Sequence, residues 1–250
     1  MIYFCFWCSN GPDPIVFSLG AEAVAKIITI DGPAGSGKST VSRLLAARLG
    51  YLYLDTGAMY RAVALQAKRN SVDLEDREKI GGLCRDLDLH FKTLDGATRL
   101  FLGDEDISVA IRSPEMDLLA SAISAIKEVR EAMTLLQRRM AGQGGVVAEG
   151  RDMGTVVFPD AEWKFFVDAD PEVRAGRRYR ERLERGEAVS REGVEKELRK
   201  RDDQDMTRAL APLVPAEDAI LLDTTDLTVE EVVAKVVKTI EGGDKKTLKE

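Results

Sequence analysis

Short apolar runs, each ending in polar residues, recur along the chain and alternate with segments of helical periodicity. Runs of this length that are rich in branched and aromatic residues are typical of strands buried on both faces. They lie at 27–30, 51–57, 145–150, 163–170 and 219–225. Strands that alternate with helices predict an α/β fold, here with a five-stranded parallel sheet flanked by helices.

The pattern changes between the second and third runs. Apolar residues alternate in 87–91 and again in 100–102, with an Asp-Gly turn between them, which predicts a β-hairpin. Apolar residues then recur at helical spacing over 113–140, which predicts one long amphipathic helix. We therefore expect an inserted subdomain with β-structure at this place.

Two highly charged helical segments follow the fourth run, separated by the stretch 185–190, and a closing helix is predicted over 229–240. From Arg174 to Arg208 the chain carries 12 basic and 9 acidic residues, whereas the whole chain carries 36 Lys and Arg against 43 Asp and Glu. A basic segment in an acidic protein predicts a local anionic ligand, although a solvated helix face would give the same pattern. The acidic balance argues against a nucleic-acid partner, and no apolar run is long enough to span a membrane.

The cysteine and histidine content narrows the chemistry. The three cysteines, Cys5, Cys8 and Cys84, do not make a disulfide framework, so reduced thiols in a cytoplasmic protein are expected. His90 is the single histidine, so neither a zinc site nor a histidine-based catalytic triad is expected.

The most informative motif follows the first run, where 28–40 reads ITIDGPAGSGKST. The spacing from Gly32 to Gly37, Lys38 and Ser39 is that of a phosphate-binding loop between a strand and a helix. Backbone N–H groups of such a loop face phosphate oxygens, the lysine reaches the outer phosphates and the hydroxyl holds Mg²⁺. A Gly-rich turn without a ligand is the alternative. The expected nucleotide-binding residues are Gly32, Pro33, Ala34, Gly35, Ser36, Gly37, Lys38, Ser39 and Thr40.

Polar residues stand at the predicted carboxyl ends of the strands, the edge at which parallel sheets bind ligands. They are Asp31, Asp55 with Thr56, 149–152 and Asp168. The signatures of GTPases are absent and a motor or transporter ATPase would need a longer chain, which leaves the small kinases. Transfer between two phosphates gathers negative charge that arginine side chains neutralise. The candidates are Arg61, Arg151, Arg174, Arg177, Arg178, Arg201 and Arg208.

Four sequence blocks together resemble the bacterial cytidylate kinase family, which belongs to the nucleoside monophosphate (NMP) kinases. The phosphate loop and the block LDTGAMYRA at 54–62 are joined by GRDMGTVVFPDA at 150–161 and RDDQDMTRALAPLVPA at 201–216. Phosphate loops are widespread, whereas the last two blocks in this order are strongly specific. The resemblance implies a P-loop NTPase-type sheet, an inserted NMP-binding subdomain and a short helical lid.

The resemblance, together with the composition of the two ends, predicts how the chain is divided. A single kinase domain is expected over 26–242, preceded by a poorly ordered extension at 1–25 and followed by a frayed tail at 243–250. Within the domain, the expected core is 26–57, 143–170 and 211–242, the NMP-binding part is about 58–142 and the lid is about 171–210.

The activity implied by the resemblance is phosphorylation of CMP and dCMP by ATP with Mg²⁺. Lys38, Arg151 and Arg208 would be catalytic, and Arg174 and Arg178 would contact ATP. The implied acceptor residues are Thr56, Arg61, Arg151 and Arg208 for the phosphate, Ser121, Arg130 and Asp152 for cytosine, and Arg201 with Asp205 for the ribose. Thr56 stands where the family also uses serine, and Glu149 where it also uses aspartate; Ser121 and Arg130 are matched by alignment rather than by a tight motif.

The chemistry of the base agrees with these roles. Cytosine offers a donor at N4 and an acceptor at N3, which a carboxylate beside an arginine matches, whereas uracil offers the reverse. Alternatives are a kinase of another small acceptor, such as another NMP or shikimate, and a nucleotide-binding module without turnover. The second anion site that the arginines predict argues against the module. No large exposed apolar face is predicted, so a monomer is expected.

Overall fold

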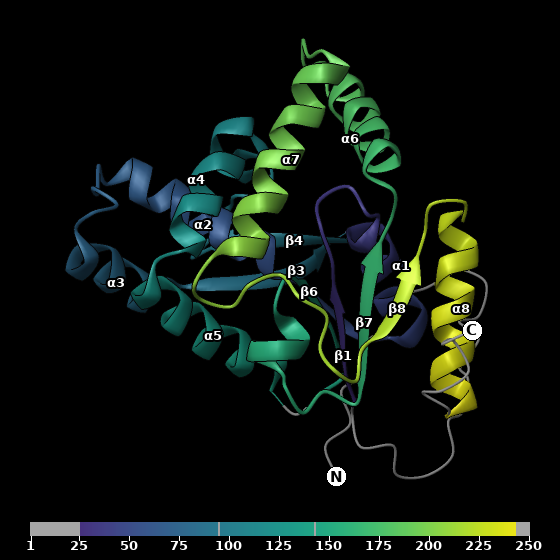
Figure 1. The fold of residues 1–250 in the computed structure, drawn as a ribbon. Helices are drawn as coiled ribbons and strands as arrows, with labels where there is room; N and C mark the ends of the chain where they lie inside the picture. The colour runs from purple at the N-terminus through teal and green to yellow at the C-terminus, as the bar shows by residue number, and fades with distance from the viewer. Residues whose placement is uncertain (1–25, 95, 143, 244–250) are drawn as a thin grey trace, which may run out of the picture.

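The computed structural model describes residues 26–94, 96–142 and 144–243, and a five-stranded parallel sheet lies at its centre (Figure 1). The strand order is β2-β6-β1-β7-β8, and every neighbouring pair is parallel. The strands are Ile27–Asp31 (β1), Leu52–Asp55 (β2), Val146–Gly150 (β6), Trp163–Asp168 (β7) and Ile220–Asp223 (β8). The predicted sheet is confirmed. The predicted extension, 1–25, and the tail residues 244–250 lie outside the described residues.

Apolar side chains cover both faces of this sheet. On one face, β1 and β7 pack against α1 (Lys38–Leu49) and α8 (Val229–Gly242), with Leu45 and Val236 fully buried between them. On the other face, β2 and β6 pack against the helices of the inserted segment. Burial of each large aliphatic side chain contributes about 1.5–3 kcal/mol, so the sheet is a rigid base for whatever lies at its carboxyl edge.

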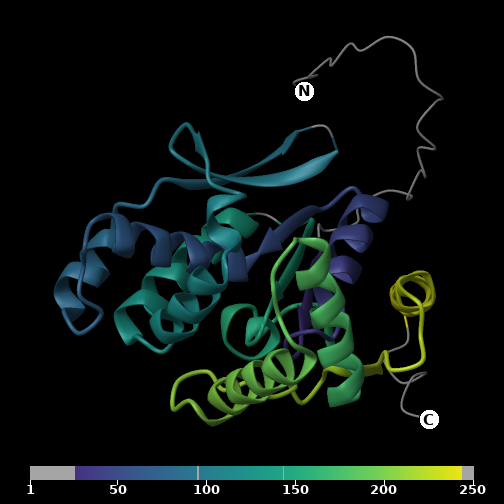
Figure 2. The same ribbon diagram turned by 90° about the horizontal axis from the view of Figure 1, so that it is seen from above.

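The segment between β2 and β6 begins with two helices, α2 (Thr56–Arg69) and α3 (Arg77–Arg85), and continues into a small antiparallel sheet. The strands of that sheet are β3 (Leu89–Leu94), β4 (Ala97–Leu102) and β5 (Glu105–Asp106). Figure 2 shows the hairpin at the edge of the molecule. The predicted β-hairpin is confirmed. Helix α3 was not predicted, because its sequence REKIGGLCR combines two poor helix formers with few apolar residues.

The single long helix predicted over 113–140 is wrong, since the chain forms two helices, α4 (Pro114–Ser124) and α5 (Lys127–Ala141). The residue before α5 is extended, with ψ 123°, and interrupts the helical ladder. Arg130 stabilises the break by donating to the carbonyl of Ser124 at 3.1 Å, a group that the end of α4 leaves without a helical partner. The apolar spacing runs unchanged across the break, so periodicity alone could not reveal it.

Helices α6 (Pro171–Glu184) and α7 (Arg191–Thr207) form a hairpin that stands above the carboxyl ends of β7 and β8 (Figure 1). This confirms the two charged helices of the sequence. Their shared apolar cluster is small, with Ala34, Ala175, Val194 and Leu198 as its buried members, so charged contacts make up much of their attachment. No helix among the described residues is long and apolar enough to cross a membrane.

Candidate functional site

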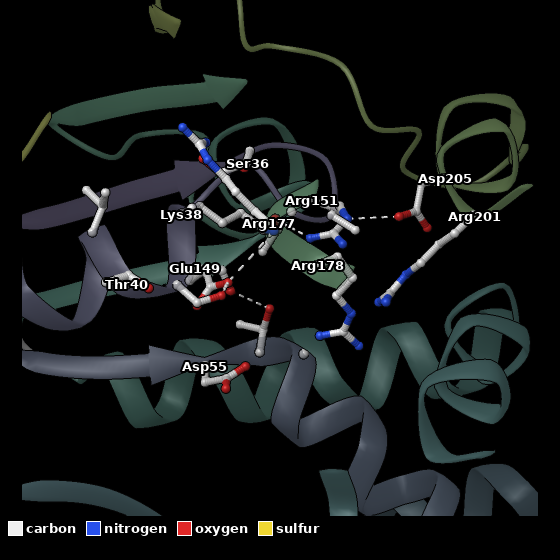
Figure 3. Close-up of a pocket in the computed structure, with 18 of the residues that line it drawn as sticks. Ser36, Lys38, Thr40, Asp55, Glu149, Arg151, Arg177, Arg178, Arg201 and Asp205 are labelled. Carbon is white, nitrogen blue, oxygen red and sulfur yellow. Dashed lines mark hydrogen bonds and ion pairs between the residues drawn. The ribbon is translucent and has the colours of Figure 1, made fainter. Parts of the chain in front are cut away.

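A cleft of about 590 Å³ opens at the carboxyl edge of the parallel sheet, between the loop after β1 and the helix pair α6–α7 (Figure 3). It is lined by the phosphate loop from Ala34 to Val41, by the ends of β2 and β6, and by side chains of α2, α4, α5, α6 and α7. Of the polar strand ends predicted at this edge, Asp55 with Thr56 and residues 149–152 line the cleft, whereas Asp31 and Asp168 are not among its lining residues. A second cavity of about 610 Å³ lies between α4 and the helix pair and shares Ser121, Arg201 and Arg208 with the cleft.

The loop after β1 has the backbone of a phosphate cradle. Gly32, Gly35 and Gly37 all have positive φ, and a Cβ on Gly32 would lie 2.0 Å from the Val167 carbonyl oxygen, so that position accepts glycine alone. Helix α1 begins at Lys38 directly behind the loop, which points its free N–H groups and its dipole toward the cleft.

Lys38 is buried at the base of this loop. Its Nζ donates to the Pro33 carbonyl at 3.0 Å and lies 4.0 Å from Oε1 of Glu149. Burial, reinforced by the positive charge of Arg151, lowers the pKa of Lys38 to about 7. The side chain is therefore held in place before any ligand arrives, and an anion placed beside it would restore its charge.

Side-chain oxygen atoms of Ser39, Tyr53 and Glu149 lie close together next to Lys38. The hydroxyl of Ser39 donates to Oε1 of Glu149 at 2.5 Å, and the hydroxyl of Tyr53 donates to the other carboxylate oxygen. A hydroxyl and a carboxylate side by side are the hard ligands that Mg²⁺ prefers. Among the described residues no cluster of three or more His, Cys, Asp or Glu could hold a metal, so a metal here would take its remaining ligands from phosphate and water.

Asp152 and Arg130 form a buried ion pair on the opposite side of the cleft. Arg208 lies 3.8 Å from the same carboxylate, and the Arg130 guanidinium stands 5.9 Å from the ring centre of Tyr60. Burial raises the pKa of Asp152, although Arg130, Arg208 and Arg151 oppose the shift. The pair predicted for the base from the resemblance is therefore assembled, with Arg130 brought there by the break between α4 and α5.

Arg151 and Asp205 form a second pair, with Nε of Arg151 donating to the carboxylate at 2.8 Å (Figure 3). The family resemblance predicts that Asp205 acts together with Arg201, which lies one turn earlier on α7. In the structure Arg201 points into the cleft, and its buried Nε has no hydrogen-bond partner among the described residues (Figure 3). Burial and the nearby Arg151 lower the pKa of Arg201 to about 10, although Asp117 and Asp205 oppose the shift.

Arg61 and Arg178 approach the cleft from two sides and share one carboxylate, that of Asp117 on α4. Arg178 donates to it at 2.6 Å, while Arg61 lies 3.7 Å from it and 3.6 Å from Asp55. Asp117 was missed by sequence reasoning, because an acidic residue in the first turn of a helix usually serves the helix dipole alone.

Three further residues that were predicted to contact a nucleotide, Thr56, Ser121 and Arg174, differ in where their side chains lie. The Thr56 hydroxyl donates to the Glu149 carbonyl at 2.6 Å, and the Ser121 hydroxyl lies 3.4 Å from Gln204, both at the lining of the cleft. Arg174 lies behind the phosphate loop rather than in the cleft: it donates to the carbonyl of Ala34 at 3.2 Å and pairs with Asp202. Its guanidinium braces the loop from α6.

The family model described as cytidylate kinase matches residues 28–242. A cytidylate kinase of Carboxydothermus hydrogenoformans is 50% identical over 213 residues, covering 85% of this chain and 96% of that protein. Another, from Caldicellulosiruptor bescii, is 48% identical over 211 residues, covering 84% and 93%.

Among solved structures, a shikimate kinase from Acinetobacter baumannii matches with a TM-score of 0.45 and 14% identity, covering 88% of this chain and 95% of that one. A likeness at that level has no bearing on which acceptor this chain uses. The sequence relatives, in contrast, extend across the strands, the inserted segment and the helix pair.

Proposed function

The chain belongs to the cytidylate kinase family, and from that premise we propose that it transfers the terminal phosphoryl group of ATP to CMP and dCMP, with the cleft residues in the roles argued below. The two relatives reported above, which share about half of its residues, are both named cytidylate kinase. That name supports CMP and dCMP as acceptors over shikimate or another NMP. A monomeric state and a cytoplasmic location stay predictions.

One observation of the site carries the proposal: two sets of cationic groups face each other across a single cleft. On one side are Lys38 and the N–H groups of the phosphate loop. On the other are arginines from separate elements, of which Arg61, Arg201 and Arg208 each have a buried guanidinium nitrogen without a hydrogen-bond partner among the described residues. Buried donors of this kind need acceptors, and phosphate oxygens supply them.

We assign the donor to the phosphate loop. The residues Gly32 to Thr40 would surround the β- and γ-phosphates, with Lys38 at the phosphate that is transferred. Ser39 and Glu149 fit Mg²⁺ as oxygen ligands. When bound, the ion would neutralise charge on the phosphates. Arg178, which lines the cleft from α6, would contact ATP, whereas Arg174 would act through the loop that it braces.

We assign the acceptor to the arginine side. Arg61, Arg151 and Arg208 would hold the CMP phosphate, with Thr56 at the same edge, and Arg201, Asp205 and Ser121 would meet the sugar and base. Asp152 would accept from the N4 amino group of cytosine while Arg130 donates to N3. Each of these side chains lines the cleft or its shared cavity.

The chemistry then requires alignment rather than proton removal. The CMP phosphate is already an anion and attacks without a general base, so the protein has to bring two anions together and stabilise the charge between them. Lys38 and Arg151 both line the cleft, and the positive charge of Arg151 contributes to the lowered pKa of Lys38. Closure of α6–α7 over the cleft would exclude water and so suppress hydrolysis of ATP.

A panel of acceptors tests the proposal directly. Initial rates at fixed ATP and Mg²⁺ would be measured with CMP, dCMP, UMP, AMP and shikimate as acceptors. We expect CMP and dCMP to give the highest kcat/KM, with UMP far lower because its ring presents the opposite hydrogen-bonding groups. A preference for AMP, UMP or shikimate would overturn the assignment. ATP binding without acceptor-dependent ADP release would identify a regulatory module instead.

A further inference from the structure

The last residue of β1, Asp31, makes contacts that the proposed roles do not use. The residue is 5% exposed, and its carboxylate bonds to a segment other than the phosphate loop that follows it in sequence. One carboxylate oxygen accepts the backbone N–H of Met153 at 2.9 Å, and the other accepts that of Gly154 at 2.8 Å. A buried carboxylate is thus committed to two main-chain donors more than a hundred residues away.

These two donors begin a short π-helical turn, Met153–Val157, that follows directly after Asp152. Asp152 occupies the N-cap position, where an aspartate ordinarily bonds the first free N–H groups of its own helix. Here it makes no such bond, and Asp31 serves those N–H groups instead. The Asp152 carboxylate is therefore left to meet Arg130 and Arg208.

Packing keeps the turn where Asp31 holds it. A Cβ on Gly154 would lie 3.0 Å from the Thr29 hydroxyl and 3.2 Å from Cδ of Lys164, so the turn lies directly on β1 and β7. Met153 is almost fully buried beside it. Any shift of the turn would carry Asp152 with it, because the two are adjacent in the chain.

We propose that Asp31 is a positioning residue for base recognition: by capping the turn at Met153–Val157 it frees the Asp152 carboxylate for the acceptor base. The inference rests on the proposed function, since it assigns the base to Asp152. It also links the two halves of the cleft, because the residue that ends the strand before the donor loop sets the orientation of a residue on the acceptor side.

Asp31→Asn tests this with little change in shape. An amide has one acceptor oxygen and an NH₂ group that would face a second N–H, so the turn loses one bond and gains a repulsion. We expect KM for CMP to rise at least tenfold and the CMP:UMP ratio of kcat/KM to fall at least fivefold. KM for ATP should change by less than about twofold. A matched control is Asp76→Asn, which alters the cap of α3 away from the cleft. This variant should change neither KM for CMP nor the CMP:UMP ratio of kcat/KM.

A double-mutant cycle separates positioning from general stability. In an Asp152→Ala background the carboxylate that Asp31 positions is gone, so adding Asp31→Asn should leave the CMP:UMP ratio where Asp152→Ala already put it. Melting temperatures would be recorded for every variant. A folded Asp31→Asn enzyme with wild-type selectivity, or an equal loss of selectivity in both backgrounds, would overturn the proposal.

Asp31→Ser, which keeps one acceptor oxygen in a smaller side chain, replaces Asp31→Asn if the latter does not fold. Failure of both to fold would assign Asp31 to the stability of the sheet and overturn the positioning role. Failure of the proposed function would look different, because the wild-type enzyme itself would then show no preference for CMP over UMP.

Discussion

The two sides of the cleft are built in different ways. The donor side comes mainly from one continuous segment, Ala34 to Val41, with Glu149 of β6 and Arg178 of α6 added to it, and works largely through backbone N–H groups and one lysine. The acceptor side is assembled from α2, α4, α5, α7 and the end of β6, and works through side chains. A backbone cradle is fixed by local sequence, whereas a side-chain site depends on which distant residues the fold brings together.

The two sides also differ in how their charges are compensated. On the acceptor side Arg130 and Arg151 are already paired, with Asp152 and Asp205 respectively, so an incoming nucleotide adds to or exchanges with existing ion pairs. On the donor side, the polar contacts of Lys38 within the described part of the chain are a carbonyl at hydrogen-bond distance and a carboxylate at 4.0 Å. The acceptor side thus combines paired arginines with Arg201, whose buried Nε has no hydrogen-bond partner among the described residues, whereas the donor side relies on one lysine.

The largest effect is expected from Lys38→Ala on the donor side. The lysine charge should meet the transferring phosphoryl group most strongly in the transition state, so kcat should fall by roughly 10³-fold or more, about 4 kcal/mol. The melting temperature should not fall, because the substitution removes a buried cation whose pKa is already depressed. A variant within tenfold of the wild-type rate would contradict the donor assignment.

A smaller and one-sided effect is expected from Arg208→Ala on the acceptor side. Loss of a largely buried, charge-assisted contact to phosphate costs roughly 2 kcal/mol or more, so KM for CMP should rise about 30-fold while KM for ATP stays within about threefold. Arg61→Ala should act in the same direction. The control is Arg199→Ala, since that arginine is exposed on α7 and pairs only with Glu195 among the described residues. An equal rise in both KM values would move Arg208 to the donor side.

The smallest effect concerns protons. Because the pKa of Lys38 in the free protein is lowered to about 7, the side chain is mostly neutral at pH 8. Phosphate anions beside it raise that pKa, so ATP binding at pH 8 should take up roughly half to one proton. Calorimetric titration with MgATP in buffers of different ionisation enthalpy measures this uptake. Lys38→Arg should abolish it, because a guanidinium stays protonated; an enthalpy independent of buffer in the wild type would contradict the linkage.

The contrast between the two sides explains what the sequence could predict. The strands and the phosphate loop were recoverable, because each is signalled by consecutive residues such as the glycines that need positive φ. The break between α4 and α5 was not, because it depends on a contact between Arg130 and the Ser124 carbonyl that leaves the apolar spacing intact. The helix pair α6–α7 was visible from charge alone.

Side-chain partners were the least predictable feature. Arg151 and Arg201 both lie near Asp205, and which of them pairs with it depends on the paths of β6 and α7 rather than on spacing along the chain. Tyr53 and Asp117 gave no signal, since a tyrosine in a strand and an aspartate in a first helical turn are ordinary there. Asp31 was noted only as a strand end, and its partners, Met153 and Gly154, required the fold.

The central claim is that Asp152 and Arg130 recognise the acceptor base through hydrogen bonds. Asp152→Asn tests this claim most directly. The asparagine can donate a hydrogen bond where the aspartate accepts one. Discrimination against UMP should therefore decrease, while CMP loses a charge-assisted bond. Arg130 still favours the N3 acceptor, so only part of the discrimination should disappear. We predict that the CMP:UMP ratio of kcat/KM falls by roughly ten- to a hundredfold, about 1.4–2.7 kcal/mol, with most of the loss on CMP. An unchanged ratio, with both acceptors slowed alike, would show that Asp152 serves only its ion pairs, and would contradict the account.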